Sequence, residues 1–281
     1  MGAGFEPVLT EDGSWTLAHP EHGEACHSLH GAWEEALLRY ARPCRLAELA
    51  ASRREARASS GAPVRLLDVG TGLGLNLAAA LAECGDVPLE VVTLESDPRV
   101  VRAGLELPCG PADAAPFQLA CRQSLAAALA APGRAVPLGA GRVRLLLGDG
   151  RATLAELPAR PQFDAVFLDP FSPARGRGLW EREFLSLVAA RMQPAALLST
   201  YTSSLTVRVE LARAGLAVGR GPRVGTKGSG TLASLPRGSG GEALPALDPR
   251  TQRRLDARVA RSGPAGPKAP PLGGEMDGAF A

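Results

Sequence analysis

Apolar residues in the middle of the chain occur in short, nearly continuous runs that are separated by amphipathic stretches. The runs predict buried strands at 64–69, 89–95, 142–148, 165–169 and 195–200. Between the runs, apolar residues recur every three to four positions, which predicts helices at 76–83, 98–107, 152–157, 180–191 and 205–214. Apolar strands that alternate with helices form a parallel sheet covered on both faces. The sequence therefore predicts an α/β fold.

The segments on either side of this core have different patterns. Residues 1–60 predict a hairpin around Asp12-Gly13 and two helices, within 31–41 and 45–58. From about residue 236 the periodicity ends and Gly and Pro become frequent, which is typical of a disordered tail with one short basic helix near 251–261. We therefore divide the chain into an N-terminal extension (1–60), a core domain (61–235) and a tail (236–281).

Composition narrows the choice of compartment and partner only a little. The net charge of +2 neither requires nor excludes a nucleic-acid partner. No apolar run approaches ~18 residues and no secretory leader is recognisable, so we expect a cytoplasmic protein that does not span a membrane. The five cysteines are scattered without a C-x-x-C pair, which favours reduced thiols. His19, His22, His27 and His30 form two H-x-x-H pairs, but no second cysteine cluster completes a zinc site. We expect surface histidines and no metal.

Glycines and acidic residues follow the predicted strands. The first strand ends in DVGTGLGLN, which contains Asp68, Gly70, Gly72, Gly74 and Asn76. Such glycines either let the backbone approach a ligand closely or form only a tight structural turn. Glu95 ends the next strand, about twenty residues later, where related sheets place an acid on a ribose diol. Asp97 precedes Pro98 and is expected to cap the following helix instead.

Two further acids end later strands. Asp149 either accepts from the amine of an adenine or caps the helix that follows, and both readings are equally consistent with the local sequence. Asp169 is delivered to the carboxyl edge of the sheet, where open α/β sheets bind ligands, and Pro170 and Pro173 stiffen the loop after it. The glycine spacing is not that of a dinucleotide site, and no phosphate-binding Gly-Lys-Ser/Thr is present. The four strand ends together favour S-adenosylmethionine over NAD or a nucleoside triphosphate.

Several motifs in order carry a family resemblance. The segments HSLHGAWEEA, DVGTGLGLN, FDAVFLDPFSP, LLSTYTSS and GPRVGTKGSGTLAS resemble the methyltransferase domain of the MnmC family, most closely its stand-alone form, MnmD. The resemblance covers roughly residues 26–234. It implies a Rossmann-like class I methyltransferase fold without the flavin oxidoreductase domain. It also implies methyl transfer from S-adenosylmethionine to the amine of 5-aminomethyl-2-thiouridine at the tRNA wobble position. The loops at 174–178 and 225–230 depart from the family pattern.

The resemblance also suggests roles for individual side chains. Asp169 would orient the amine and stabilise the charge that develops on its nitrogen. Phe171 and Tyr201 would stack on the uracil, although core packing is an equally good explanation for both. The remaining pocket residues implied by the family are Glu24, His27, Ser28 and Lys227. Arginines at 53, 54, 57, 175, 177, 220 and 223 are candidates for phosphate contacts, with a solvated surface as the alternative.

Besides methyl transfer to another amine, two other functions remain open at this point. An aminopropyltransferase of the spermidine-synthase type also uses a glycine loop, an acid after the second strand and an acidic loop at the same sheet edge. A methyltransferase fold without activity could instead serve as an RNA-binding partner. The intact Gly70, Gly72, Gly74, Glu95 and Asp169 argue against the second of these.

Overall fold

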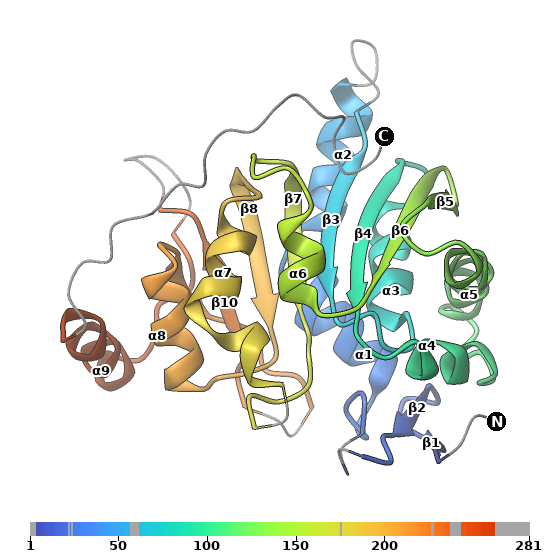
Figure 1. Cartoon of the computed structure of the whole chain (residues 1–281), viewed down its shortest axis with the longest axis horizontal. Helices are drawn as coiled ribbons and strands as arrows, with labels where there is room; N and C mark the ends of the chain where they lie inside the picture. Colours follow the sequence, from blue (N-terminus) through green and yellow to red (C-terminus); the bar gives the residue numbers. More distant parts are fainter. Residues whose placement is uncertain are drawn as a thin grey trace.

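The central sheet has eight strands, in the order β5-β6-β4-β3-β7-β8-β10-β9 (Figure 1). The computed structural model describes residues 4–21, 23, 25–56, 62–174, 176–225, 228–236 and 243–261. The five predicted strands are all present and pair in parallel: β3 (Val64–Val69), β4 (Leu89–Glu95), β6 (Gly141–Leu147), β7 (Phe163–Leu168) and β8 (Met192–Thr200). The predicted α/β class is therefore confirmed.

Three strands were not predicted. β5 (Ala135–Leu138) pairs antiparallel with β6, and β10 (Thr231–Ser234) pairs antiparallel with both β8 and β9 (Ala217–Arg220). Each is only four residues long, too short for alternation of apolar and polar residues to be visible in the sequence. The helix α5 (Ala115–Ala130) was also missed, because its alanine-rich sequence has no clear apolar stripe.

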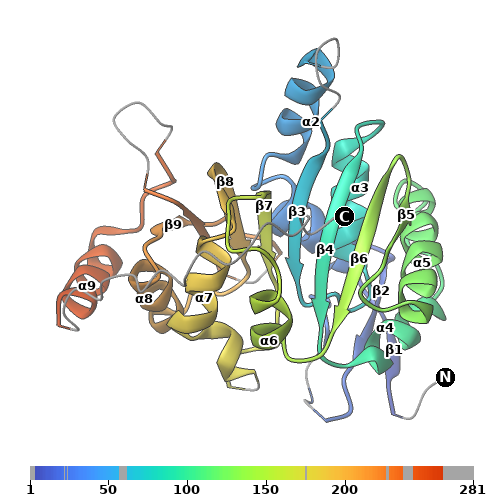
Figure 2. The same ribbon diagram turned by 45° about the horizontal axis from the view of Figure 1, so that its top comes forward.

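Helices cover both faces of the sheet (Figures 1 and 2). Alternate residues of the strands enter two separate cores: Leu66 and Val91 pack in one, Leu67 and Val92 in the other. The first core lies under α3 (Leu75–Cys84), α4 (Pro98–Leu105) and α5; the second lies under α6 (Gly150–Ala155), α7 (Arg182–Ala189) and α8 (Leu205–Arg213). The predicted helix at 180–191 is preceded by a 3-10 turn, η3 (Arg177–Trp180).

The N-terminal segment covers the carboxyl ends of the parallel strands. The predicted hairpin is formed by β1 (Glu6–Leu9) and β2 (Trp15–Ala18), and it lies below the strand tips in Figure 1. Asp12 in its turn accepts a hydrogen bond from the backbone N–H of Glu34 at 2.9 Å, which attaches the hairpin to the next helix. That helix is α1 (Ala32–Glu35), and it continues into a π-helix, η1 (Ala36–Ala41), and then α2 (Leu46–Glu55). These helices pack against α3, in the first core.

The expectation of surface histidines is wrong for two of them. His19 and His27 are 2% and 7% exposed, because the hairpin packs over the strand ends instead of extending into solvent. The ring of His19 meets Phe5 and Phe171 edge-on, each at 5.0 Å between centroids. His30 is partly exposed and pairs with Glu11 at 2.5 Å. His22 lies outside the described residues.

The basic helix predicted near 251–261 is present as α9 (Pro249–Ala260). Asp248 caps its N-terminus by accepting from the N–H of Thr251 at 2.9 Å. Leu255 is buried with Val209 of α8 and with Leu247, so this part of the predicted tail is packed on the core domain. Residues 237–242 and 262–281, for which the sequence predicts disorder, lie outside the described residues. Within the part that is described, no helix is long and apolar enough to cross a membrane.

Candidate functional site

The glycine turn after β3 lies against the loop after β7. Gly70 has a φ of +94°, and a Cβ there would lie 2.5 Å from the backbone oxygen of Asp169. The N–H of Asp169 donates to Val69 O at 2.8 Å, and the N–H of Gly70 donates to Leu94 O at 3.0 Å. Only glycine combines this left-handed conformation with so close an approach. The turn thus brings the ends of β3, β4 and β7 together.

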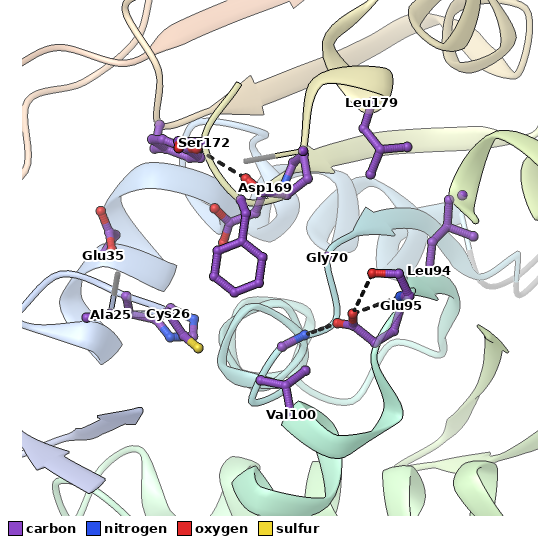
Figure 3. Close-up of a pocket in the computed structure, with 18 of the residues that line it drawn as sticks. Ala25, Cys26, Glu35, Gly70, Leu94, Glu95, Val100, Asp169, Ser172 and Leu179 are labelled. Carbon is purple, nitrogen blue, oxygen red and sulfur yellow. Dashed lines mark hydrogen bonds between the residues drawn. The ribbon is translucent and has the colours of Figure 1, made fainter. Parts of the chain in front are cut away.

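The carboxylate of Glu95 holds the centre of that turn. It accepts from the N–H groups of Gly72, Ser96 and Asp97 at 3.0, 2.8 and 2.9 Å. Burial raises the pKa of Glu95 above its usual value, although these three hydrogen bonds act in the opposite direction. Glu95 faces a cavity (Figure 3), and its binding of a ribose diol stays a prediction. Asp97 caps α4 by accepting from the N–H of Arg99 at 2.8 Å, as predicted.

Asp169 is held on both carboxylate oxygens. The hydroxyl of Tyr40 donates to Oδ1, and Nδ2 of Asn76 donates to Oδ2 at 2.7 Å. Burial, and then the negative charge of Asp169, raise the pKa of Tyr40 well above its usual value, so the phenol remains a donor at neutral pH. Asn76 was predicted to bind the cofactor; the contact that the structure gives it is with the carboxylate of Asp169.

A cavity of about 580 Å³ opens between the strand ends and the N-terminal segment. Asp169 and Glu95 lie on opposite sides of it, and Ala25 and Cys26 close it from the hairpin side (Figure 3). Burial and the carboxylates of Glu95 and Asp169 raise the pKa of Cys26 to about 12, so this thiol stays protonated at neutral pH. The predicted residues that line the cavity are His27, Gly70, Gly72, Glu95, Asp169, Phe171 and Tyr201.

The sequence did not single out Glu35 and Tyr40. Glu35 lines the cavity, is 4% exposed, and accepts from the N–H of Ser28 at 2.6 Å. Both residues lie in the α1–η1 segment, whose pattern predicts an ordinary helix. The one local signal is GAWEEALLRY itself, in which adjacent acids and a tyrosine occur in a largely apolar helix. The π-helical turn, a feature often found at functional sites, was not predictable from these residues.

Four predicted site residues lie close to the cavity but do not line it. Asp68 is fully buried beneath the glycine turn, where its Oδ2 accepts from the hydroxyl of Thr93 at 2.8 Å. Burial raises the pKa of Asp68 well above its usual value. A Cβ on Gly74 would lie 2.5 Å from Leu125 of α5, so this glycine lets α3 and α5 approach closely. Ser28 contributes its N–H to Glu35, and Asn76 acts on Asp169.

The structure shows Asp149 as the cap of α6. Its carboxylate accepts from the backbone N–H of Arg151 at 2.9 Å and also forms an ion pair with the guanidinium group of Arg151. Its neighbours Gly148 and Gly150 line the cavity, so an adenine contact for Asp149 stays a prediction. Glu24, Arg57, Arg175 and Lys227 lie outside the described residues.

Phe171 and Tyr201 both line the cavity and are both packed. The hydroxyl of Tyr201 donates to Pro170 O at 3.1 Å, and its ring meets Trp180 edge-on at 5.8 Å. The indole N–H of Trp180 donates to Phe171 O at 2.9 Å. These contacts hold the loop that carries Asp169 against Tyr201 and Trp180, and they leave the rings of Phe171 and Tyr201 at the cavity wall.

Some predicted phosphate-binding arginines are already paired. Arg53 lies 3.1 Å from Asp164, Arg54 lies 2.7 Å from Asp86, and Arg177 lies 3.3 Å from Glu181. Arg53 and Arg54 also lie on α2, towards the end of the sheet opposite the hairpin (Figure 1). These ion pairs favour the alternative of a solvated surface for the three residues.

The cavity has the features that S-adenosylmethionine requires. Its volume lies within the range of about 300–1,000 Å³ that is usual for small-molecule sites. Glu95 in the cavity wall is a carboxylate of the kind that accepts from a ribose diol, and Leu94, Val100 and Leu179 form an apolar wall of the kind that suits an adenine ring. A Cβ on Gly72 would have only Gly70 O within 4 Å, so the backbone there is open to a ligand. The residues present therefore fit this cofactor.

Comparisons with known proteins agree with this geometry. Residues 120–236 match a family described as an S-adenosyl-L-methionine-dependent methyltransferase. The crystal structure of MNMC2 from Aquifex aeolicus is 33% identical, with a TM-score of 0.74 over 90% of this chain and 76% of that one. Spermidine synthase from Thermotoga maritima is 13% identical, with a TM-score of 0.53 over 94% of this chain and 81% of that one, a likeness of fold alone.

A curated relative extends the match to longer proteins. The tRNA 5-methylaminomethyl-2-thiouridine biosynthesis bifunctional protein MnmC of Ralstonia nicotianae is 35% identical over 179 residues, which are 61% of this chain. The chain spans only 27% of the length of that relative. The sequence and the structure thus support the same assignment, and the chain belongs to the MnmC-like family of S-adenosylmethionine-dependent methyltransferases.

Proposed function

We propose that this enzyme methylates the primary amine of 5-aminomethyl-2-thiouridine at the wobble position of tRNA. The observation that carries the proposal is a pair of carboxylates, Asp169 and Glu35, in the cavity that also contains the glycine turn and Glu95. Acidic groups at this place suit an acceptor that arrives as an amine. The names of the relatives, which refer to tRNA 5-methylaminomethyl-2-thiouridine biosynthesis, support the choice of nucleoside.

In this proposal Asp169 positions the amine. S-adenosylmethionine supplies an electrophilic methyl group on a sulfonium that is a good leaving group, so the protein mainly has to align the acceptor. Tyr40 and Asn76 each occupy one lone pair of the Asp169 carboxylate and fix its orientation. The carboxylate of Asp169, held in this orientation, would accept from the amine N–H groups and stabilise the positive charge that develops on nitrogen.

Glu35, the second carboxylate of the pair, acts on the charge of the amine in this proposal. A primary alkyl amine is protonated at pH 7, and it must pass one proton to the carboxylate of Glu35 or to water before its lone pair can attack the methyl group. Glu35 lies in the cavity wall, five positions before Tyr40 in the chain, and its negative charge lowers the electrostatic cost of bringing the ammonium form into a buried site. Phe171 and Tyr201 would flank the uracil, as aromatic side chains commonly hold unstacked RNA bases.

A methyl-transfer assay tests this function. Labelled S-adenosylmethionine is incubated with tRNA that carries 5-aminomethyl-2-thiouridine, and the nucleosides are then analysed by mass spectrometry. The expected product is one methyl group heavier at that nucleoside. The matched control is the same tRNA with unmodified uridine at the wobble position, which should receive no label. Equal labelling of both tRNAs, or none of either while the cofactor binds, would rule out the proposed substrate.

A further inference from the structure

Helix α9 and Arg261, the residue that follows it, carry five arginines around a groove at the edge of the molecule. The groove has a volume of about 340 Å³ and is lined by Arg250, Arg253, Arg254, Ala257, Arg258 and Arg261. Positions 250, 254, 258 and 261 follow a spacing of three or four residues, which places them along one side of the helix. At about 1.5 Å per residue, this row is about 16 Å long. The helix thus presents a continuous positive strip.

The opposite side of α9 is used for packing. Leu255 is 4% exposed, and it packs with Val209 of α8 and Leu247, with Val259 against the same cluster. Nη2 of Arg213 in α8 donates to the backbone oxygen of Arg258 at 3.5 Å. The helix is therefore attached to the core domain in one orientation, and that orientation turns the arginines away from α8.

Several arginines elsewhere in the described chain are paired with acids. Arg53, Arg54, Arg65 and Arg151 each form an ion pair with a carboxylate. In the described part of the chain, no ion pair joins Arg250, Arg253, Arg254 or Arg261 to an acid. Like charges spaced by four residues on a helix repel one another. These four arginines, on a protein of net charge +2, are thus a local concentration of positive charge that an anionic partner would neutralise.

We propose that α9 binds the phosphate backbone of tRNA at a distance from the methylated base; this inference rests on the proposed function. Arginine contacts to phosphate need no base sequence, and a row of about 16 Å can reach several phosphates of one strand. A membrane suits the strip less well, because interfacial helices insert an apolar face and the apolar residues of α9 are used against α8. The strip also lies outside residues 120–236, which match the family.

The position of α9 suits a contact of this kind. α8 starts at Leu205, shortly after Tyr201 at the cavity, and α9 packs along α8 on its outer side (Figures 1 and 2). Only α8 therefore separates the strip from the segment around Tyr201 that lines the cavity.

The double variant Arg253→Ala/Arg254→Ala tests the proposal. Both side chains are exposed, so their removal leaves the packing of α9 unchanged. The matched control is Arg102→Ala/Arg134→Ala, which removes the same charge from exposed positions on α4 and before β5. tRNA affinity is measured by fluorescence anisotropy between 50 and 200 mM salt, together with cofactor affinity and Tm.

Each phosphate contact contributes about 0.7–0.9 to the slope of log affinity against log salt. The α9 variant should therefore lose about 1.4–1.8 of slope, so that fourfold more salt weakens its binding about 7- to 12-fold less than that of the wild type. The control should keep the wild-type slope, and cofactor affinity should be unchanged in both. Arg253→Lys/Arg254→Lys should keep most of the slope, because the charge is retained.

Three outcomes would overturn the inference. The first is that the α9 variant keeps the salt slope of the wild type. The second is that the α9 variant and the control lose slope equally, which would indicate a general charge effect. The third is unchanged tRNA binding with lost binding to vesicles containing 30% phosphatidylserine, which would identify a membrane surface instead. Failure of the proposed function would give a different result: the wild type would transfer no methyl group, although its tRNA binding still depended on α9.

Discussion

Replacing Gly70 by alanine tests whether the positions of the glycine turn and of the loop that carries Asp169 depend on direct contact between their backbones. The new Cβ would lie 2.5 Å from the oxygen of Asp169, 2.9 Å from its carbonyl carbon and 3.2 Å from the nitrogen of Pro170. All three are backbone atoms, so no flexible side chain can move aside. The alanine would also have to adopt a φ of +94°. We expect the loop after β7 to move and to carry Asp169 away from Tyr40 and Asn76.

The magnitude follows from two separate costs. The left-handed conformation costs a non-glycine residue about 1–2 kcal/mol. Displacing packed backbone adds about 1–3 kcal/mol, so the total is about 2–5 kcal/mol. Gly133 is the matched control, because its φ is +79° and a Cβ there would have nothing within 4 Å. Gly133→Ala should therefore show the conformational cost alone.

Thermal unfolding and enzyme kinetics measure the two effects. One kcal/mol corresponds to about 2–4 °C in Tm for a domain of roughly this size. Gly70→Ala should have the lower Tm of the two variants and should lose methyl transfer, whereas Gly133→Ala should keep its activity. If both variants have the same Tm and both are active, the contact between the two loops is not needed, and the explanation given for this glycine is wrong.

Three further substitutions give separate predictions. Asp169→Ala should lower kcat by about 10²-fold or more while cofactor affinity, measured by calorimetry, stays within a factor of two; full activity would remove Asp169 from the mechanism. Tyr40→Phe deletes one hydrogen bond to Asp169 and should lower kcat about tenfold with little change in cofactor affinity; a change confined to cofactor affinity would contradict a role through Asp169. Asp68 has a raised pKa in the folded state, so its contribution to stability is present at low pH and is lost as pH rises from its usual value towards the raised one. Relative to wild type, Asp68→Asn should therefore gain up to about 1.4 kcal/mol per pH unit across that interval, measured by urea unfolding at pH 5 to 8, and a difference independent of pH would show that Asp68 is ionised in the folded protein.

The parallel core of the fold was predictable because its strands are apolar on both faces. Val64–Val69 and Leu89–Glu95 are largely apolar runs, followed by Gly70 and ended by Glu95 respectively, and both bounds agree with the structure. The strands β9 and β10 were not predictable, because each has four residues and gains its apolar environment only from neighbours in the sheet. The hairpin was predicted, but its position over the strand ends depends on contacts such as Asp12 to Glu34 that no local pattern contains.

In the site, too, residues marked by a local sequence pattern were predictable, and residues that depend on distant contacts were not. Glu95 and Asp169 were found because each follows a strand, and the strand ends of a parallel sheet meet at one edge. Tyr40 and Glu35 were missed because their role depends on partners far away in the sequence. Asn76 was found for its position after the glycines, but its partner, Asp169, is 93 residues away and was not predictable.

The large sequence separations at the site have a consequence for synthesis of the protein. Tyr40 meets Asp169 across 129 positions, and Arg39 donates to Pro222 O across 183. At about 5–20 residues per second, a ribosome needs about 9–37 s to extend the chain over the second of these separations. During that time Trp33 and Leu46, both buried in the finished protein, have emerged without the sheet that covers them. The N-terminal segment is therefore made well before the strands that it covers, and its buried apolar side chains stay exposed in the nascent chain until β8 and β10 have been synthesised.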